Sequence, residues 1–245
     1  MWLSAASALA APPASDRSGL PGGKNRRLFH RVISESGMVK SLLTNPDLAT
    51  AKATGQQFAT AMGCADQSAR CLRSLSVRDI LTRGVAFSSQ GGVIVDGTIL
   101  PRTLGAALSS GQFNRVPFVN GVNRDELRWT VGLTELATGH VLTAAEYPDR
   151  LRASFGAANV GRILARYPLS NYASPSLAVA AAQTDAQFSC TVRQVSQWVS
   201  RHVLRTYSYE FADRTAPPFF PRVSFPYGAS HTLEIPYLFP LYHGA

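Results

Sequence analysis

The sequence lacks the patterns of membrane-spanning, fibrous and repeat proteins. No apolar run reaches the roughly 18 residues that a membrane-spanning helix needs, and neither a sustained heptad nor a fixed-period repeat is present. These absences argue against a transmembrane helix, a coiled coil and a solenoid. What remains is a chain of 245 residues, 45% hydrophobic and 16% charged, which is typical of one large globular domain with a sizeable core.

Lysine is scarce, because 21 of the 24 basic residues are arginine. The net charge of +9 raises the question of a nucleic-acid partner, but the basic residues are scattered. The densest group is KNRR at residues 24–27, and no aromatic residues are interleaved with it for stacking on bases. We therefore interpret the excess charge as solvated surface and expect no nucleic-acid partner.

Cysteine is scarce too, and none of the three cysteines has a second cysteine or histidine at metal-ligand spacing. Cys64 and Cys71 are close enough in sequence to close a small loop. Such a bridge would stabilise the fold by about 2–3 kcal/mol by constraining the unfolded chain, and it would indicate an oxidising compartment. Two unpaired thiols are the alternative. Cys190 has no evident partner.

The opening stretch MWLSAASALAAP lacks the positively charged segment and the long apolar run of an export signal. The small residues at 8–10 resemble a cleavage site, but the apolar run before them is short and rich in Ser and Ala. We interpret residues 1–11 as a helix and residues 12–25 as a loop. We expect no signal peptide in this chain.

Strand and helix patterns alternate along the rest of the sequence. Apolar, β-branched stretches predict strands at residues 28–34, 116–119 and 204–211. Capping residues, glycine stops and apolar spacings of three to four residues predict helices at 47–62, 76–84 and 103–113, a pair within 143–167, and one at 184–203. This alternation indicates a layered α/β domain.

Polar segments follow two of the predicted strands. Glu126 follows the strand at 116–119, and His231 follows the strand at 204–211 after an irregular stretch. In parallel sheets reactive groups collect beyond the carboxyl ends of the strands, so both side chains are predicted to face one crevice. A lone histidine is more often structural than catalytic, and further information has to decide its role.

Four segments resemble the type-B carboxylesterases, the family that also contains cholinesterases and some lipases. The segments are LFHRVISESG, VDGTILPRTLGAALSSGQFNRVPFVNGVNRDE, DAQFSC and GASHTLEIPYLF. They occur in register from about residue 28 to residue 239, nearly the whole chain. The resemblance implies a carboxylesterase domain over residues 1–245 with the α/β-hydrolase fold.

The resemblance also implies a serine nucleophile, a glutamate and a histidine in that chain order. The motif GVNRDE assigns the acid to Glu126, and GASH assigns the base to His231. His231 would take the proton of the attacking serine and return it to the leaving alkoxide, while Glu126 would orient and stabilise the imidazole. The implied reaction is hydrolysis of a carboxylic ester through an acyl-enzyme, with no metal or other cofactor.

Two further residues have supporting roles in this interpretation. Ser36, in SESG, resembles a family serine that supports the acid by hydrogen bonding, and an ordinary polar loop residue is the alternative. Glu234 is expected to brace the local backbone or a helix start rather than to act chemically.

The nucleophile motif G-x-S-x-G is absent from the 245 residues, and so is a glycine-rich oxyanion loop. MWLSAASALAAP resembles the helix that leads away from the nucleophile, and only PLYHGA follows the last matching segment. We therefore expect a domain truncated at both ends, which holds only the later strands and helices of the sheet and is inactive by itself. The alternatives are a cholinesterase-like binding or adhesion module without catalysis, and a decayed gene fragment.

The expected partner is a small-molecule carboxylic ester of unspecified identity, because the acyl and alcohol pockets would take residues from absent segments. The sequence does not predict an oligomeric state. The family and the possible disulfide predict a secreted or extracytoplasmic location.

Overall fold

The computed structural model describes residues 29–38, 40–84, 87 and 93–239. The chain divides into two compact units. Unit 1 holds Met1–Phe29 and Ser41–Arg115, and unit 2 holds His30–Lys40 and Val116–Ala245. The helix predicted at residues 1–11 and the loop predicted at 12–25 lie outside the described residues.

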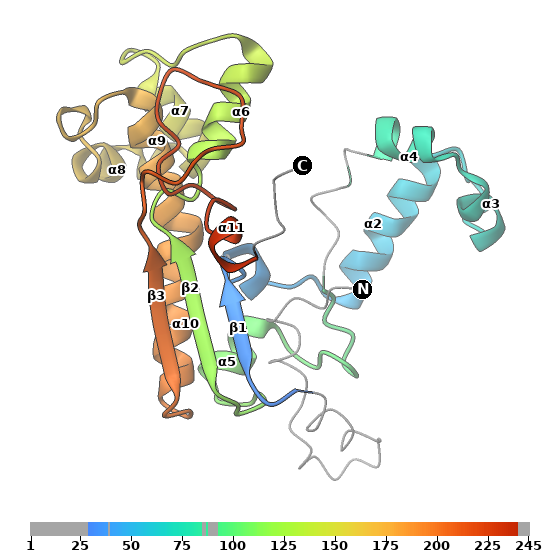
Figure 1. The fold of residues 1–245 in the computed structure, drawn as a ribbon. Helices are drawn as coiled ribbons and strands as arrows, with labels where there is room; N and C mark the ends of the chain where they lie inside the picture. Colours follow the sequence, from blue (N-terminus) through green and yellow to red (C-terminus); the bar gives the residue numbers. More distant parts are fainter. Residues whose placement is uncertain (1–28, 39, 85–86, 88–92, 240–245) are drawn as a thin grey trace. The chain divides into compact units, whose positions relative to one another are not determined.

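Unit 2 contains a three-stranded parallel sheet in the order β1 (Val32–Glu35), β2 (Phe118–Asn123) and β3 (Thr206–Phe211). Val32 is paired with Phe118, and Phe118 is paired with Thr206. The strands are parallel, so their carboxyl ends lie at one edge of the sheet (Figure 1). The sheet and the helices of this unit are consistent with part of an α/β-hydrolase fold.

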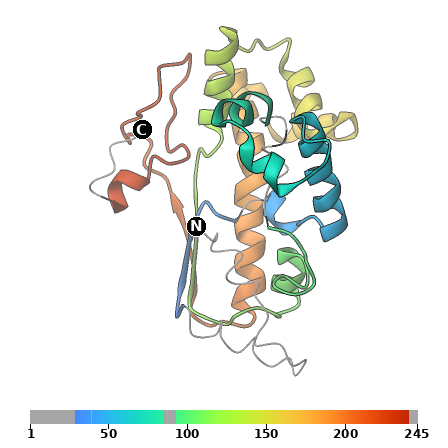
Figure 2. The same cartoon turned by 90° about the vertical axis from the view of Figure 1, so that its right-hand side faces the viewer.

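The helices of unit 2 lie after β2 and β3 in the chain. They are α6 (Arg128–Thr138), α7 (Tyr147–Phe155), α8 (Val160–Arg166), α9 (Pro175–Thr184), α10 (Cys190–Ser200) and α11 (Ile235–Leu238). Short 3-10 turns occur at η4 (Ala157–Asn159) and η5 (Leu169–Asn171). Helix α10 runs along one face of the sheet (Figure 2), while α6 to α9 lie beyond the carboxyl ends of the strands (Figure 1).

The face of α10 toward the sheet has the spacing that the sequence predicts. Val192, Val195 and Val199 are all buried, and they recur at intervals of three and four residues. On the middle strand, the Asn120 amide nitrogen donates to the Val192 carbonyl at 3.1 Å and to the Ser196 hydroxyl at 3.0 Å. The buried amide therefore ties α10 to the centre of the sheet.

The helix predicted at residues 184–203 differs from the structure in its start and in its regularity. Helical backbone begins at Pro175, after Ser174, whose hydroxyl accepts a hydrogen bond from the Leu177 amide. Between α9 and α10 lies a π-helical turn, η6 (Asp185–Ser189). A π turn inserts one extra residue into the helical register and is frequent at functional sites.

A hydrophobic cluster forms between α6, α7 and α9. Its fully buried members include Tyr147 and Leu151 of α7 and Val179 of α9. The Tyr147 hydroxyl also donates to the Tyr167 carbonyl at 2.7 Å, just after α8. The predicted helical pair within 143–167 is thus present as α7 and α8.

Unit 1 is formed by short helices with local caps. Its elements are η2 (Lys40–Leu43, which begins at the boundary with unit 2), α2 (Leu48–Ala61), α3 (Ala69–Ser74), α4 (Val77–Arg83) and α5 (Leu104–Ser109). Asp47 accepts a hydrogen bond from the Thr50 amide at the start of α2, and Ser76 accepts one from the Asp79 amide at the start of α4. Side-chain oxygens at this position satisfy amides that have no partner within the helix.

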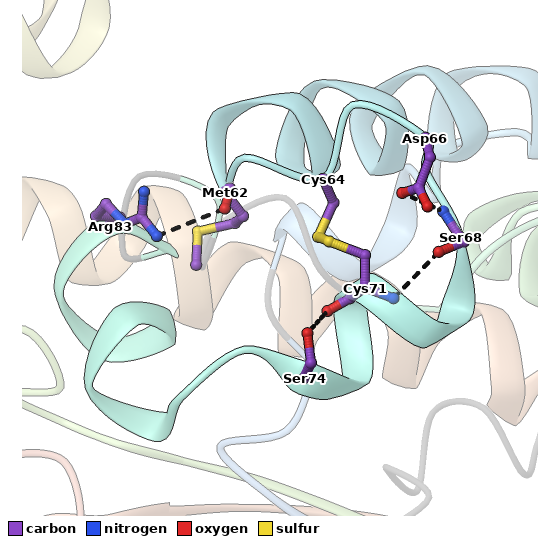
Figure 3. Close-up of a disulfide and its surroundings, with 7 residues drawn as sticks. All are labelled: Met62, Cys64, Asp66, Ser68, Cys71, Ser74 and Arg83. Atoms are coloured by element: carbon purple, nitrogen blue, oxygen red, sulfur yellow. Dashed lines mark hydrogen bonds between the residues drawn. A yellow bond between two sulfur atoms is a disulfide. The ribbon is translucent and has the colours of Figure 1, made fainter.

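The predicted disulfide is present in unit 1. The Sγ atoms of Cys64 and Cys71 are 2.00 Å apart, and the bridge joins the turn after α2 to α3 (Figure 3). The Ser68 hydroxyl accepts a hydrogen bond from the Cys71 amide at 3.1 Å, which caps α3 beside the bridge (Figure 3). Cys190 has a free, exposed thiol. Within the described ranges, no helix combines the length and apolarity needed to cross a membrane.

Candidate active site

Glu126 lies in the tight turn that follows β2 and leads into α6. We call residues 124–129, which include the first two residues of α6, the acid turn. Its side chain is fully buried. One carboxylate oxygen, Oε1, accepts a hydrogen bond from the Asn123 amide at 2.8 Å, at the last residue of β2. The strand end therefore fixes the carboxylate.

His231 reaches the same place from the other end of the unit, on the segment that follows β3. Its Nδ1 lies 2.7 Å from Oε2 of Glu126, and its backbone amide donates to the Glu126 carbonyl at 3.2 Å. The imidazole side chain is 31% exposed, whereas the carboxylate is completely covered. The imidazole is therefore partly accessible to solvent, and the carboxylate is not.

The protonation of His231 is set by two opposing effects. Burial disfavours the charged imidazole and by itself would lower the pKa of His231. The hydrogen bond to Glu126 and the negative charges of Glu126 and Glu234 together outweigh burial and raise this pKa above its ordinary value of 6.5. The pair is arranged to accept and hold a proton.

Two aromatic rings contact the imidazole. Trp129, the last residue of the acid turn, stacks on His231 with ring centroids 5.9 Å apart and an interplanar angle of 20°. Phe188, in the π-helical turn, lies 5.8 Å away at 54°. Phe220 stacks on Trp129 at 6.3 Å. Neither Trp129 nor Phe188 was assigned to the site by the sequence analysis, because no local pattern links them to a histidine more than forty residues away.

The acid turn is joined to residues 228–231 by hydrogen bonds that run in both directions. The Asp125 amide donates to the Ala229 carbonyl, and the Ala229 amide donates back to Oδ2 of Asp125 at 3.1 Å. Gly228 has φ +60°, and a Cβ there would lie 2.5 Å from Oδ2 of Asp125. Only glycine adopts this conformation without strain and also leaves room for the carboxylate.

Asp125 is itself buried and compensated by two arginines. Arg214 donates to both of its oxygens at 2.9 Å, and Arg128 lies 2.9 Å from Oδ1. A buried carboxylate requires such partners, because leaving it unpaired is costly. Asp125 was not predicted as a site residue, although it stands next to Glu126 in the motif GVNRDE.

Ser36 and Glu234 occupy the surroundings of this pair. Ser36 is buried after β1 with φ +51°, and its amide donates to the Gly121 carbonyl. Its hydroxyl makes no hydrogen bond to another described residue, so the support of the acid implied by the resemblance stays a prediction.

Glu234 is buried at the residue before α11, and its carboxylate accepts a hydrogen bond from the Asn123 side chain. The same Asn123 amide group donates to the Ser230 carbonyl at 2.8 Å. Through Asn123, Glu234 is therefore connected to the end of β2 and to the residue before His231. Asn123 was not predicted as a site residue, because an asparagine at the end of a strand is common and does not indicate a site.

A cavity of about 590 Å³ lies beside the acid turn, on the side of η5 and α9. Three arginines and three carboxylates are among its lining residues, so its walls favour neither sign of ligand charge. These residues are Arg124, Arg128, Arg214, Asp125, Asp185 and Glu210. We assign no ligand to this cavity. Within the described residues, no three or more His, Cys, Asp or Glu side chains are grouped to hold a metal ion.

The chain is similar to carboxylesterases and to an acylcarnitine hydrolase. The chain is 33% identical to rat (Rattus norvegicus) Carboxylesterase 1C over 135 residues, which cover 53% of this chain and 24% of that protein. It is 29% identical to rat Acylcarnitine hydrolase over 227 residues, 86% of this chain and 39% of that protein. A third relative, Liver carboxylesterase of Sus scrofa, is 30% identical over 123 residues, 42% of this chain and 21% of that protein.

These matches therefore span from about a fifth to about two fifths of the relatives' own length. The carboxylesterase family as a whole matches residues 20–245, which include the sheet, the acid turn and the segment with His231. Because the family match includes all of these elements in one continuous range, the chain belongs to the carboxylesterase family.

Proposed function

We propose that unit 2 supplies the acid and the base of a carboxylic-ester hydrolase, with Glu126 as the acid and His231 as the base. The observation that carries the proposal is the 2.7 Å hydrogen bond between a fully buried carboxylate and a partly exposed imidazole. The geometry is the one that a serine hydrolase requires of the two groups behind its nucleophile. Membership of the carboxylesterase family supports the assignment.

In the proposed reaction Nε2 of His231 removes the proton of a serine hydroxyl as the serine attacks the ester carbonyl. The imidazolium then protonates the departing alkoxide, which leaves an acyl-enzyme that water hydrolyses by the same steps. Glu126 keeps the other ring proton on Nδ1 and stabilises the imidazolium. The 245 residues contain no G-x-S-x-G motif, so the nucleophile in this proposal comes from sequence outside them.

The substrate class is a carboxylic ester, and no metal or other cofactor takes part. The disulfide in unit 1 favours a secreted or extracytoplasmic location, because such bridges persist in oxidising compartments. Carboxylesterase relatives are compatible with that location.

The test is to join this chain to an amino-terminal segment that carries the nucleophile. A suitable donor is the part of rat Carboxylesterase 1C that precedes its alignment with this chain. An α/β-hydrolase carries its G-x-S-x-G turn ahead of the acid and the histidine, so this part should supply the nucleophile. The chimera should hydrolyse p-nitrophenyl acetate, and the 245-residue chain alone should do so no faster than a denatured control. His231→Ala and Glu126→Gln should each lower kcat by roughly 10⁴-fold or more.

His140→Ala is the matched control. His140 also contacts a carboxylate, with Nε2 2.9 Å from Glu146, but both groups are exposed on the surface. Its loss should leave hydrolysis unchanged. A folded chimera that keeps full activity after His231→Ala would contradict the assignment, and a folded chimera without any activity would favour the binding-module alternative.

A further inference from the structure

The side chain of Ser230 joins the acid turn to the residue before His231. It is completely buried, in the residue directly before His231. Its hydroxyl accepts a hydrogen bond from the Trp129 amide at 3.0 Å and donates one to the Glu126 carbonyl at 3.3 Å. One hydroxyl therefore bonds to two residues of the acid turn, 101 and 104 positions away in sequence.

Both of these residues contact the His231 ring. Glu126 holds Nδ1 through its carboxylate at 2.7 Å, and Trp129 stacks on the face of the ring. The Ser230 hydroxyl thus bonds to the backbone of Glu126, whose carboxylate orients the imidazole in its plane. It also bonds to the backbone of Trp129, whose ring limits the tilt of the imidazole.

The Ser230 hydroxyl accepts a hydrogen bond from an amide at the start of α6. The first amides of a helix have no partner within it. The residue before α6, Leu127, has no polar side chain and provides no cap. The Thr184 hydroxyl accepts from the Leu127 amide at 3.0 Å, and the Ser230 hydroxyl accepts from Trp129. The helix that follows the acid is therefore capped by residues distant in sequence, one of which adjoins His231.

We propose that Ser230 is a positioning residue for His231, which holds the acid and the stacking ring in place around the imidazole. Its catalytic consequence rests on the proposed function, since it matters for ester hydrolysis only if His231 is the base. The geometric proposal is independent of that, because the position of the imidazole is measurable without substrate and without a nucleophile.

The test is a titration of His231 in the 245-residue chain by NMR of isotope-labelled histidine. The charges that act on the ring are those of Glu126 and Glu234, and both remain in the variants. The wild type should show a slowly exchanging Nδ1 proton and an imidazole pKa above 6.5. Ser230→Ala should lose or broaden that proton signal and lower the pKa toward 6.5.

Ser174→Ala is the matched control, because the Ser174 hydroxyl caps α9 in the same unit by accepting from the Leu177 amide. It should cost similar stability and leave the His231 signals unchanged. Equal effects of Ser174→Ala and Ser230→Ala on the imidazole would overturn the proposal, because they would indicate general loosening. A folded Ser230→Ala variant with an unchanged Nδ1 proton and pKa would overturn it directly.

If Ser230→Ala does not fold, Ser230→Cys provides the second comparison, because its thiol is a weak hydrogen-bonding group of similar shape. A folded Cys variant should show the same change at His231, and an unchanged imidazole again overturns the proposal. Failure of both variants to fold, with Ser174→Ala folded, would assign Ser230 to the fold instead of to the imidazole. Activity of the chimera tests the proposed function separately, so failure of one leaves the other standing.

Discussion

Glu126 and His231 are 105 positions apart in sequence, yet their carboxylate and imidazole form a 2.7 Å hydrogen bond. The carboxylate is held by the end of β2 and the imidazole by the segment after β3, two neighbouring strands of the same parallel sheet. Because their carboxyl ends lie at one edge, the two segments meet there. The sheet topology is what brings the pair together.

The first prediction concerns the pH dependence of stability. The pKa of His231 is raised in the folded protein, so the protonated imidazole favours folding. This contribution is complete below pH 6.5 and is lost as the pH rises through the higher pKa of the folded state. Urea unfolding of wild type and His231→Gln should therefore give a difference in free energy that shrinks as the pH increases. A difference that grows with pH would contradict the raised pKa.

The second prediction concerns Gly228. Alanine there would have to adopt φ +60° and would bring Cβ within 2.5 Å of Asp125 and 2.8 Å of Arg128. Gly228→Ala should lower the free energy of unfolding by about 2–4 kcal/mol, from backbone strain together with displacement of the ion pair. Gly139→Ala is the matched control, since it has φ +65° with open space around the added Cβ. It should cost about 1 kcal/mol, and equal losses would contradict the role of the close approach.

The third prediction concerns Asp125. Its removal would leave the largely buried Arg128 and the Ala229 amide without their partner. Asp125→Ala should lower the free energy of unfolding by about 3 kcal/mol in urea titrations. Asp149→Ala, which breaks an exposed ion pair with Arg152 on α7, should cost no more than about 0.5 kcal/mol. A loss at Asp125 as small as that at Asp149 would show that the buried pair is not required.

The fourth prediction concerns the disulfide. Replacing both Cys64 and Cys71 by Ser should lower the free energy of unfolding by about 2–3 kcal/mol, because the bridge restricts the unfolded chain. Mass spectrometry of a non-reduced digest should show the two peptides linked when the protein is made in an oxidising compartment. Cys190→Ser should change neither result, since that thiol is free. Two freely alkylated thiols at 64 and 71 would contradict the bridge.

Local chemistry made much of the fold predictable. Asp47 and Ser76 cap α2 and α4 as the sequence indicates, because a cap involves only residues two or three positions along the chain. The valine spacing of α10 identifies its buried face for the same reason. The three strands were located within a few residues, and the α/β class follows from their alternation with helices.

Elements that depend on distant partners were placed less well or missed. The strand predicted at 116–119 is observed as β2 at Phe118–Asn123, and it extends through Asn120, a buried polar residue that α10 satisfies. Helix α6 was not predicted, because Leu127 provides no cap and the partners of its first amides are Thr184 and Ser230. No window of neighbouring residues contains that information.

The sequence by itself determined the helix caps, the strand–helix alternation and, through its motifs, the choice of Glu126 and His231 as the acid and base to propose. Only the tertiary structure decided what surrounds them: Trp129 and Phe188 against the ring, Asp125 between two arginines, and Ser230 bonded to the acid turn. Caps and periodicity act over a few residues, where sequence neighbours are spatial neighbours. Burial and long-range hydrogen bonds depend on which segments the sheet brings to one edge, and that arrangement exists only once the chain has folded.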